Sequence, residues 1–266
     1  MIYHVSFPKL GINLKINPTL FSFAGFTVKW YGVIIALGFL LALLYIVKRC
    51  QSFGLKKNDV ENLALFSSAV AIICARIYYV VFYPGDFYAK NPSKILLINE
   101  GGIAIYGAII GGFLATFVYC KINKKSFLST LDLMCLGLLI GQCIGRWGNF
   151  MNQEAFGGVT TLPWGMMSEN TYGKTVHPCF LYESICCLIC FLILHFYTLK
   201  KKTRKPGKIF FIYTAYYGIT RALIESLRTD SLIIPGTSLR VSQIFGIAAA
   251  VISIIILKLK YRTSRN

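Results

Sequence analysis

The side chains best suited to chemistry gather in residues 141–158, which read GQCIGRWGNFMNQEAFGG. This stretch follows an apolar run at 133–140 and combines a cation, a carboxylate and amides: Arg146, Asn149, Asn152, Gln153 and Glu154. Such side chains are costly at membrane depth, so they predict a functional site that lines a polar cavity. The interspersed glycines predict that the backbone bends here or approaches a ligand closely. An ordinary extramembrane loop is the alternative.

A second group of polar side chains recurs at helical spacing in residues 217–228, YGITRALIESLR. Tyr217, Arg221, Glu225 and Arg228 stand at i, i+4, i+8 and i+11, roughly on one face of a helix. Arg221 and Glu225 could simply neutralise each other. An apolar helix would rarely carry four such groups only to hold itself together, so we interpret this face as part of a site.

Isolated polar residues in other apolar runs have two interpretations each. Arg76 is either a cation that faces a cavity or an arginine that extends to the membrane interface. His177 opens an apolar run, where a helix cap is the alternative to a catalyst. Trp30 and Tyr31 open another run, where aromatic residues commonly anchor a helix at the interface.

The composition excludes an ordinary soluble domain. Of the 266 residues, 56% are hydrophobic and only 14% are charged, whereas soluble domains have about 25% charged residues. The net charge of +18 therefore predicts membrane topology rather than nucleic-acid binding. The nine cysteines show no metal-ligand spacing and lie mostly in apolar runs, so neither a disulfide framework nor a metal site is predicted. Residues 1–29 have no basic segment followed by an apolar core, which argues against a cleaved signal peptide.

The apolar runs predict an all-α integral membrane protein with a single domain, residues 1–266. A run of about twenty apolar residues spans the hydrocarbon of a bilayer. About seven transmembrane helices are expected, with a polar cavity that opens toward the outer leaflet. Their approximate ranges are 30–47, 63–83, 102–120, 127–144, 178–199, 209–227 and 241–257.

The basic residues predict the orientation of these spans. Alternate loops hold four Lys and Arg at 48–57, three at 121–125, six at 200–208 and four at 258–265, together 17 of the 28. Because cytoplasmic loops accumulate basic residues, this side is predicted to be cytoplasmic, with the N-terminus outside. The unusual polar residues, among them Glu100, His177 and Arg228, then lie at the outer ends of the spans. Cations in a pocket surrounded by lipid are suited to phosphate, which arginine binds through two parallel hydrogen bonds. The residues thus indicate a protein that handles phospholipid near the outer leaflet.

The sequence also resembles a known family. GRWGNFMNQEAFG at 145–157 is similar to the signature of the bacterial prolipoprotein diacylglyceryl transferases. Further matching segments follow the same order: WYG at 30–32, ARIYYVVFY at 75–83, EGGIAIYG at 100–107, HPCFLYE at 177–183 and YGITRALIESLR at 217–228. The resemblance covers essentially all of the predicted spans.

The resemblance implies transfer of the diacylglyceryl group of phosphatidylglycerol to the thiol of the lipobox cysteine in a preprolipoprotein signal peptide. A thioether forms and glycerol phosphate is released. It implies a bacterial cytoplasmic membrane location, with membrane lipid as a partner and no cofactor. The expected catalytic residues are Arg146, Arg221, Tyr106 and Glu225. The expected phosphatidylglycerol-binding residues are Arg146, Asn149, Asn152, Glu154, Gly157, Tyr31, Arg76 and Tyr217.

One residue departs from the family pattern. Many members have a histidine where this chain has Tyr106, and a phenol with a pKa of about 10 is a poor base near neutral pH. The identity of the base is therefore open, and Tyr106 is interpreted as a base or as a hydrogen-bonding group that positions the lipid.

Two other classes of protein are alternatives. A phospholipid transporter or flippase would show inverted repeats with paired broken helices, and this sequence has one glycine-rich polar motif. A scaffold or receptor would leave the arginines within the spans unexplained.

Overall fold

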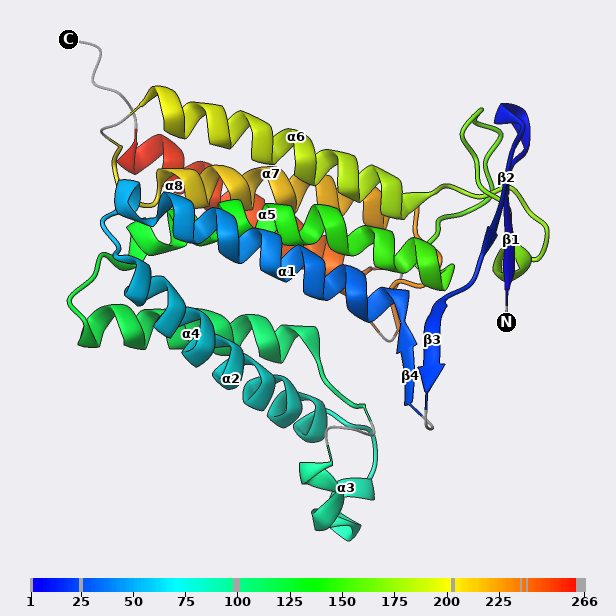
Figure 1. Cartoon of the computed structure of the whole chain (residues 1–266), viewed down its shortest axis with the longest axis horizontal. Coiled ribbons are helices and arrows are strands. Elements are labelled where there is room, and N and C mark those ends of the chain that lie inside the picture. Colours follow the sequence, from blue (N-terminus) through cyan, green and yellow to red (C-terminus); the bar gives the residue numbers. More distant parts are fainter. Residues whose placement is uncertain are drawn as a thin grey trace. The chain divides into compact units, whose positions relative to one another are not determined.

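The computed structural model describes residues 2–23, 26–97, 101–201, 204–234, 236–237 and 239–261. Its helices, labelled in Figure 1, are α1 (Trp30–Arg49), α2 (Lys57–Val81), α3 (Phe87–Lys90), α4 (Ile105–Ile122), α5 (Phe127–Asn152), α6 (Cys179–Lys200), α7 (Lys208–Glu225) and α8 (Val241–Lys260). The strands are β1 (Tyr3–Phe7), β2 (Ile12–Ile16), β3 (Thr19–Phe23) and β4 (Phe26–Lys29). The chain divides into two compact units: Met1–Tyr45 with Met134–Asn266, and Ile46–Leu133. We call them the larger and the smaller unit; the predicted single domain stays a prediction.

The predicted class of multi-pass, mainly helical membrane protein is confirmed. Within the described residues, six helices are long and apolar enough to cross a membrane: α1, α2, α4, α5, α6 and α8. The predicted span 209–227 corresponds to α7, which has 18 residues but carries Lys208, Arg221 and Glu225 and is not among the six. The count of about seven spans therefore stays a prediction.

Helix α5 differs most from its predicted range. It was expected to end near residue 144 but continues without interruption to Asn152, so Arg146 and Asn149 stand on a helix rather than in a bend. The chain turns only afterwards, where Gln153 and Ala155 adopt left-handed φ angles of 52° and 59°.

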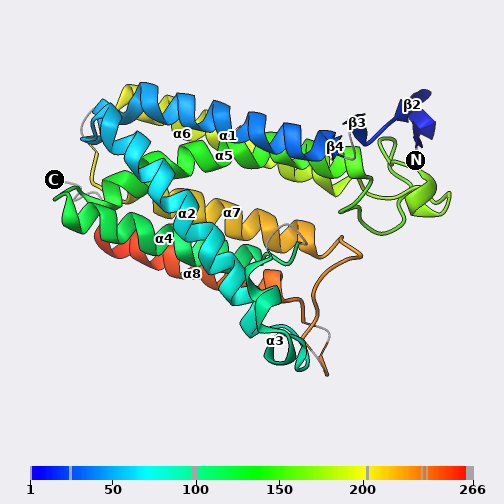
Figure 2. The same cartoon turned by 60° about the horizontal axis from the view of Figure 1, so that its bottom comes forward.

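Glycines in α5 allow helix α1 to pack closely against it. A Cβ added to Gly148 would lie 2.9 Å from the ring of Tyr31, and one added to Gly145 would lie 3.1 Å from Ile35. Figures 1 and 2 show α1 running alongside α5 in both views. These two glycines therefore make room for α1 instead of bending the chain.

Helices α7 and α8 also pack through glycines. A Cβ on Gly218 would lie 2.4 Å from the carbonyl oxygen of Gly246, so this close approach of the two helices requires glycine at position 218. Arg240 donates a hydrogen bond to the backbone carbonyl of Glu225, and the Gln243 amide donates to that of Ala222 at 3.3 Å. The end of α7, which carries the predicted site residues, is thereby held by α8.

The segment before α1 forms two antiparallel hairpins, β1–β2 and β3–β4. Side chains of the first hairpin share a small core with the end of α5, the start of α6 and the connection between them: Val5, Ile16, Phe150, Met166, Val176 and Phe180. Backbone hydrogen bonds of 2.8 Å between Ser6 and Met167 attach β1 to that connection. The hairpin therefore supports the segment that follows α5.

In the smaller unit, α2 packs against α4 through two further glycines. A Cβ on Gly107 would lie 2.4 Å from the Cys74 carbonyl oxygen, and one on Gly111 would lie 2.9 Å from that of Val70. Lys125 closes the other end of this pair with an ion pair of 2.6 Å to Asp59. Glu100, which the sequence placed at the outer end of a span, lies outside the described residues.

Candidate functional site

A buried carboxylate on α6 joins three arginines in the larger unit. Glu183 is 4% exposed; its Oε2 lies 2.5 Å from Arg146 Nη2 on α5, and its Oε1 lies 2.7 Å from Arg221 Nη1 on α7. Arg228, three residues beyond the end of α7, approaches Oε1 at 3.4 Å. Two predicted catalytic residues, Arg146 and Arg221, are therefore brought together by a third side chain. We call Arg146, Glu183, Arg221, Glu225, Arg228 and Asp230 the arginine centre.

Two more carboxylates complete the arginine centre. Glu225, 2% exposed, pairs with Arg221 Nη2 at 2.5 Å, so the i, i+4 pairing considered from the sequence does form. Asp230 holds Arg228 through two hydrogen bonds, of 2.9 Å from Nε and 2.7 Å from Nη2. Burial by itself would raise the pKa of Asp230, but the hydrogen bonds and charge of Arg228 outweigh it and lower that pKa below 3.8.

The three arginines of this centre balance its three carboxylates in charge, but they differ in the number of carboxylates that each one contacts. Arg221 and Arg228 each contact two carboxylates, whereas Arg146 contacts one among the described residues. The Arg146 side chain is also the most exposed of the three, at 22% against 17% and 11%. Because a guanidinium has five N–H donors, Arg146 has the greatest capacity left for an anionic ligand.

Amide side chains extend the centre from Arg146 toward the end of α5. The amide oxygen of Asn149 lies 3.4 Å from Arg146 Nη1, and its nitrogen donates to Glu154 Oε1 at 2.9 Å. Asn152 donates to the same carboxylate oxygen at 3.4 Å. These four predicted residues thus form a continuous polar chain, although α5 ends between Asn152 and Glu154.

Gly157 lies deep in the backbone packing beside this centre. Its N–H donates to the His177 carbonyl at 2.8 Å, and the next N–H, of Gly158, donates to the Leu227 carbonyl at 2.8 Å. A Cβ on Gly157 would lie 2.8 Å from the Leu227 carbonyl oxygen. This arrangement joins the segment after α5 to the start of α6 and the end of α7. It requires glycine for packing, while contact of Gly157 with lipid stays a prediction.

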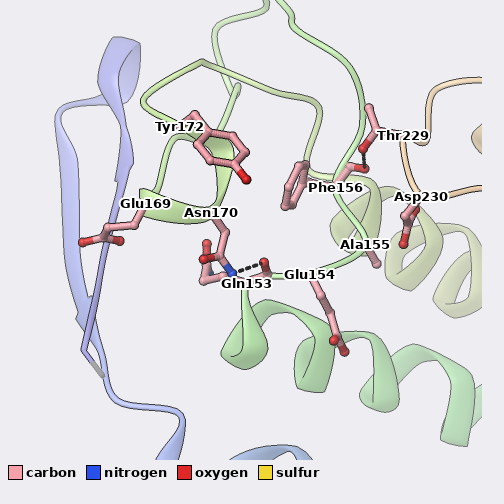
Figure 3. A pocket seen from close by; sticks show the side chains of 9 residues that line it. All are labelled: Gln153, Glu154, Ala155, Phe156, Glu169, Asn170, Tyr172, Thr229 and Asp230. Carbon is pink, nitrogen blue, oxygen red and sulfur yellow. Dashed lines mark hydrogen bonds between the residues drawn. The ribbon is translucent and has the colours of Figure 1, made fainter.

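A pocket of about 320 Å³ with several polar lining residues opens beyond the ends of α5 and α7 (Figure 3). Its lining includes Glu154 and Asp230, which contact Asn149 and Arg228 respectively, together with Gln153, Ala155, Phe156, Glu169, Asn170, Tyr172 and Thr229. The backbone N–H and the imidazole of His4 donate to Glu169, and this lowers the pKa of that carboxyl. The pocket offers oxygen acceptors beside the arginine centre. That a cavity opens toward the outer leaflet stays a prediction.

The two predicted tyrosines of the larger unit, Tyr31 and Tyr217, lie near residues of the arginine centre. Tyr31 packs on Gly148, within α5 between Arg146 and Asn149. Tyr217 precedes Arg221 by four residues on α7 and stacks on Tyr213, with ring centroids 5.8 Å apart. Tyr213 in turn receives a hydrogen bond of 3.1 Å from Gln142, so polar contacts continue into the helical interior.

The remaining two predicted residues, Arg76 and Tyr106, belong to the smaller unit. Arg76 on α2 is 7% exposed, and its guanidinium donates to backbone carbonyls of the segment before α4. Tyr106 lies in the first turn of α4, and its ring centroid is 6.3 Å from that of Tyr78.

Sequence reasoning missed Glu183 and Asp230 as site residues, and it placed Arg228 on the polar face of residues 217–228 without giving it a role. The available signal was a carboxylate five residues into an apolar helix, in HPCFLYE, where an unpaired charge would be costly. What the sequence could not specify was its partners, because Arg221 is 38 residues away in the chain.

Apolar helices around a buried arginine–carboxylate centre define a multi-pass membrane protein with a site suited to an anionic group. A family model described as prolipoprotein diacylglyceryl transferase matches residues 18–259. The chain belongs to this family.

Similar proteins carry the name phosphatidylglycerol–prolipoprotein diacylglyceryl transferase. The protein of Clostridioides difficile is 42% identical over 245 residues, covering 92% of this chain and 96% of the relative. That of Limosilactobacillus reuteri is 42% identical over 256 residues, covering 93% and 92%. That of Bacillus cytotoxicus is 39% identical over 265 residues, covering 96% of both chains. These names describe a transferase and give no support to the transporter considered from the sequence.

Proposed function

We propose that this protein transfers the diacylglyceryl group of phosphatidylglycerol to the thiol of the lipobox cysteine in a preprolipoprotein signal peptide. Family membership supports the reaction. The pairing of Glu183 with Arg146 and Arg221 supports the assignment of this reaction to particular residues. These ion pairs hold two guanidinium groups among apolar helices, where they could bind a lipid phosphate.

The chemical step exchanges one bond for another. The cysteine sulfur attacks the diacylglycerol carbon that carries the phosphate, and a carbon–sulfur bond forms. The carbon–oxygen bond to the phosphate breaks, its electron pair leaves with glycerol phosphate, and the thiol proton passes to a base. Arginine suits this reaction because it binds phosphate oxygens in pairs and stabilises the charge of the leaving group.

We assign lipid phosphate binding first to Arg146, the arginine with the most unused donors. Arg221 supplies charge from the other side of Glu183. Glu225 holds Arg221 in place, and its nearly complete burial favours this role over that of the thiol base. Tyr106 remains our candidate for proton transfer or lipid positioning, through its place in the family motif.

Other residues shape the proposed lipid site. Asn149, Asn152 and Glu154 orient the head group through the polar chain that begins at Arg146. Gly157, Tyr31 and Tyr217 line or support it. We place the protein in the bacterial cytoplasmic membrane, with the N-terminus outside and the basic loop at 200–208 in the cytoplasm.

A direct test uses purified protein, phosphatidylglycerol vesicles and a synthetic lipobox peptide, with the peptide mass as the measurement. We expect a mass gain of one diacylglyceryl group, which is absent when the cysteine is replaced by serine or when phosphatidylethanolamine replaces phosphatidylglycerol. An unmodified peptide in the presence of folded protein and phosphatidylglycerol would contradict the proposal. Movement of lipid between leaflets without peptide modification would favour a transporter instead.

A further inference from the structure

The guanidinium of Arg76 donates to backbone carbonyls in residues 94–97 and 101–102. Its Nε donates to the Ile95 carbonyl at 2.8 Å and its Nη2 to that of Lys94 at 2.7 Å. Nη1 donates at 2.8 Å to the carbonyls of both Gly101 and Gly102, and Nη2 also contacts that of Leu97 at 3.3 Å. These contacts engage all three nitrogens of a side chain that is 7% exposed. Among the described residues, little donor capacity is left for a phosphate.

Two glycines supply carbonyl acceptors to this guanidinium, and one of them packs tightly against it. Gly101 and Gly102 both have left-handed φ angles, +88° and +78°. A Cβ on Gly102 would lie 2.4 Å from Arg76 Nη1, whereas one on Gly101 would meet open space. The rings of Tyr79 and Tyr88 lie 5.9 Å and 5.4 Å from the guanidinium carbon and cover it further.

The same part of α2 fixes the start of α4. Ala104 N–H donates to the Ala75 carbonyl at 3.1 Å, next to Arg76 in the chain. Gly107 packs against Ala75, where a Cβ would lie 2.8 Å from its Cα. Tyr106 lies between these two attachment points. The backbone on both sides of Tyr106 is thus attached to α2, only a few residues after the Gly102 carbonyl that Arg76 holds.

We propose that Arg76 is a positioning residue that holds residues 94–97 and 101–102 on α2 and thereby orients Tyr106, and that it does not itself bind the lipid phosphate. This replaces the lipid-binding role predicted for Arg76, and it rests on the proposed function and on participation of Tyr106. Arginine is required because its planar group reaches several carbonyls at once, which the single ammonium of lysine cannot do.

The test compares Arg76→Lys, Gly102→Ala and their combination, with Gly101→Ala as the matched control. Both alanines impose the left-handed φ cost, but only the one at position 102 collides with Arg76. We expect Arg76→Lys and Gly102→Ala each to lower kcat about tenfold or more, while the Kd for phosphatidylglycerol stays within about twofold. The combination should be no worse than either alone, and Gly101→Ala should be milder.

A second measurement does not depend on activity. Release of residues 94–97 in Arg76→Lys and Gly102→Ala should accelerate cleavage by trypsin at Lys94 in the folded protein, and Gly101→Ala should change it less. If the parent protein shows no transferase activity but the variants are cleaved faster, the positioning role is upheld and the proposed function is rejected. A rise of about tenfold in the Kd for phosphatidylglycerol with unchanged kcat and cleavage would make Arg76 a lipid ligand. Additive effects of the two substitutions would equally overturn the proposal.

Discussion

Glu183 Oε2 on α6 lies 2.5 Å from Arg146 Nη2 on α5, and this contact connects the polar motif at the end of α5 to the rest of the arginine centre. Without it, Arg146 would have only the amide oxygen of Asn149, at 3.4 Å, as a partner among the described residues. The other oxygen of the same carboxylate contacts Arg221 and Arg228. Loss of the Glu183 charge should therefore disturb three arginines at once.

We expect Glu183→Gln to lower both thermal stability and activity strongly. Breaking a buried ion pair typically costs about 3–5 kcal/mol because it leaves a buried charge uncompensated. Thermal unfolding in detergent and the transfer assay are the measurements. Glu61→Gln is the control, because Glu61 is half exposed and its ion pair with Lys57 is long, at 3.9 Å. Equal unfolding temperatures and equal transfer activities of the two variants would show that Glu183 does not stabilise the arginine centre.

Lysine at Arg146 should reduce turnover more than lysine at Arg221, while both proteins insert and express. Lysine keeps the charge but loses the two-pronged geometry, and one lost charge-assisted hydrogen bond corresponds to about 1.5–3 kcal/mol, roughly a factor of 10 to 150 in rate. The ranking follows from the single carboxylate partner of Arg146. Turnover of both variants within about twofold of the parent protein would refute bidentate phosphate binding.

Phenylalanine at Tyr106 distinguishes a base from a positioning group. We favour positioning, because a phenol with a pKa of about 10 is mostly protonated near neutral pH. Tyr106→Phe should then weaken lipid binding and retain substantial turnover, since a neutral hydrogen bond contributes about 0.5–1.5 kcal/mol. Turnover against pH with saturating lipid and peptide is the measurement. Complete loss at every pH, with lipid binding intact, would identify Tyr106 as a participant in proton transfer; Tyr106→His should be tolerated in either case.

The orientation can be tested by cysteine accessibility after the native cysteines are replaced by serine. We expect Tyr172→Cys, on the side of the N-terminal hairpins and 91% exposed, to react with an impermeant reagent in intact cells. A cysteine at Lys205, in the basic loop between α6 and α7, should react only after lysis. Labelling of position 205 in intact cells would show that the predicted orientation is wrong.

Asp230→Asn should destabilise the protein at pH 7 but much less at pH 3. Arg228 lowers the pKa of Asp230 below 3.8, so the folded state favours the ionised carboxyl. The stabilisation is therefore present above the unfolded pKa and is lost as the pH falls through the folded value. Thermal unfolding of both proteins at the two pH values measures this, with Asp86→Asn, 76% exposed, as the control. An equal difference at pH 3 would show that the Asp230 charge is not responsible.

The sequence by itself determined the class of protein, the approximate helices and the family motif. Runs such as 30–47 and 178–199 predicted α1 and α6 to within a few residues, because the length needed to cross hydrocarbon and the preference for apolar side chains are local properties. The same argument placed Arg146, Arg221 and Glu225 near one another at the ends of the spans.

Only the tertiary structure decided which partners these side chains have. Glu183 meets Arg221 across 38 residues of sequence, and the Arg76 guanidinium, predicted to bind phosphatidylglycerol, donates to backbone carbonyls. Likewise, α5 continues past Gly145 and Gly148 because α1 packs on them. Hydropathy and spacing fix where a polar residue stands on its helix, but the donors and acceptors that it meets depend on how distant helices and loops pack.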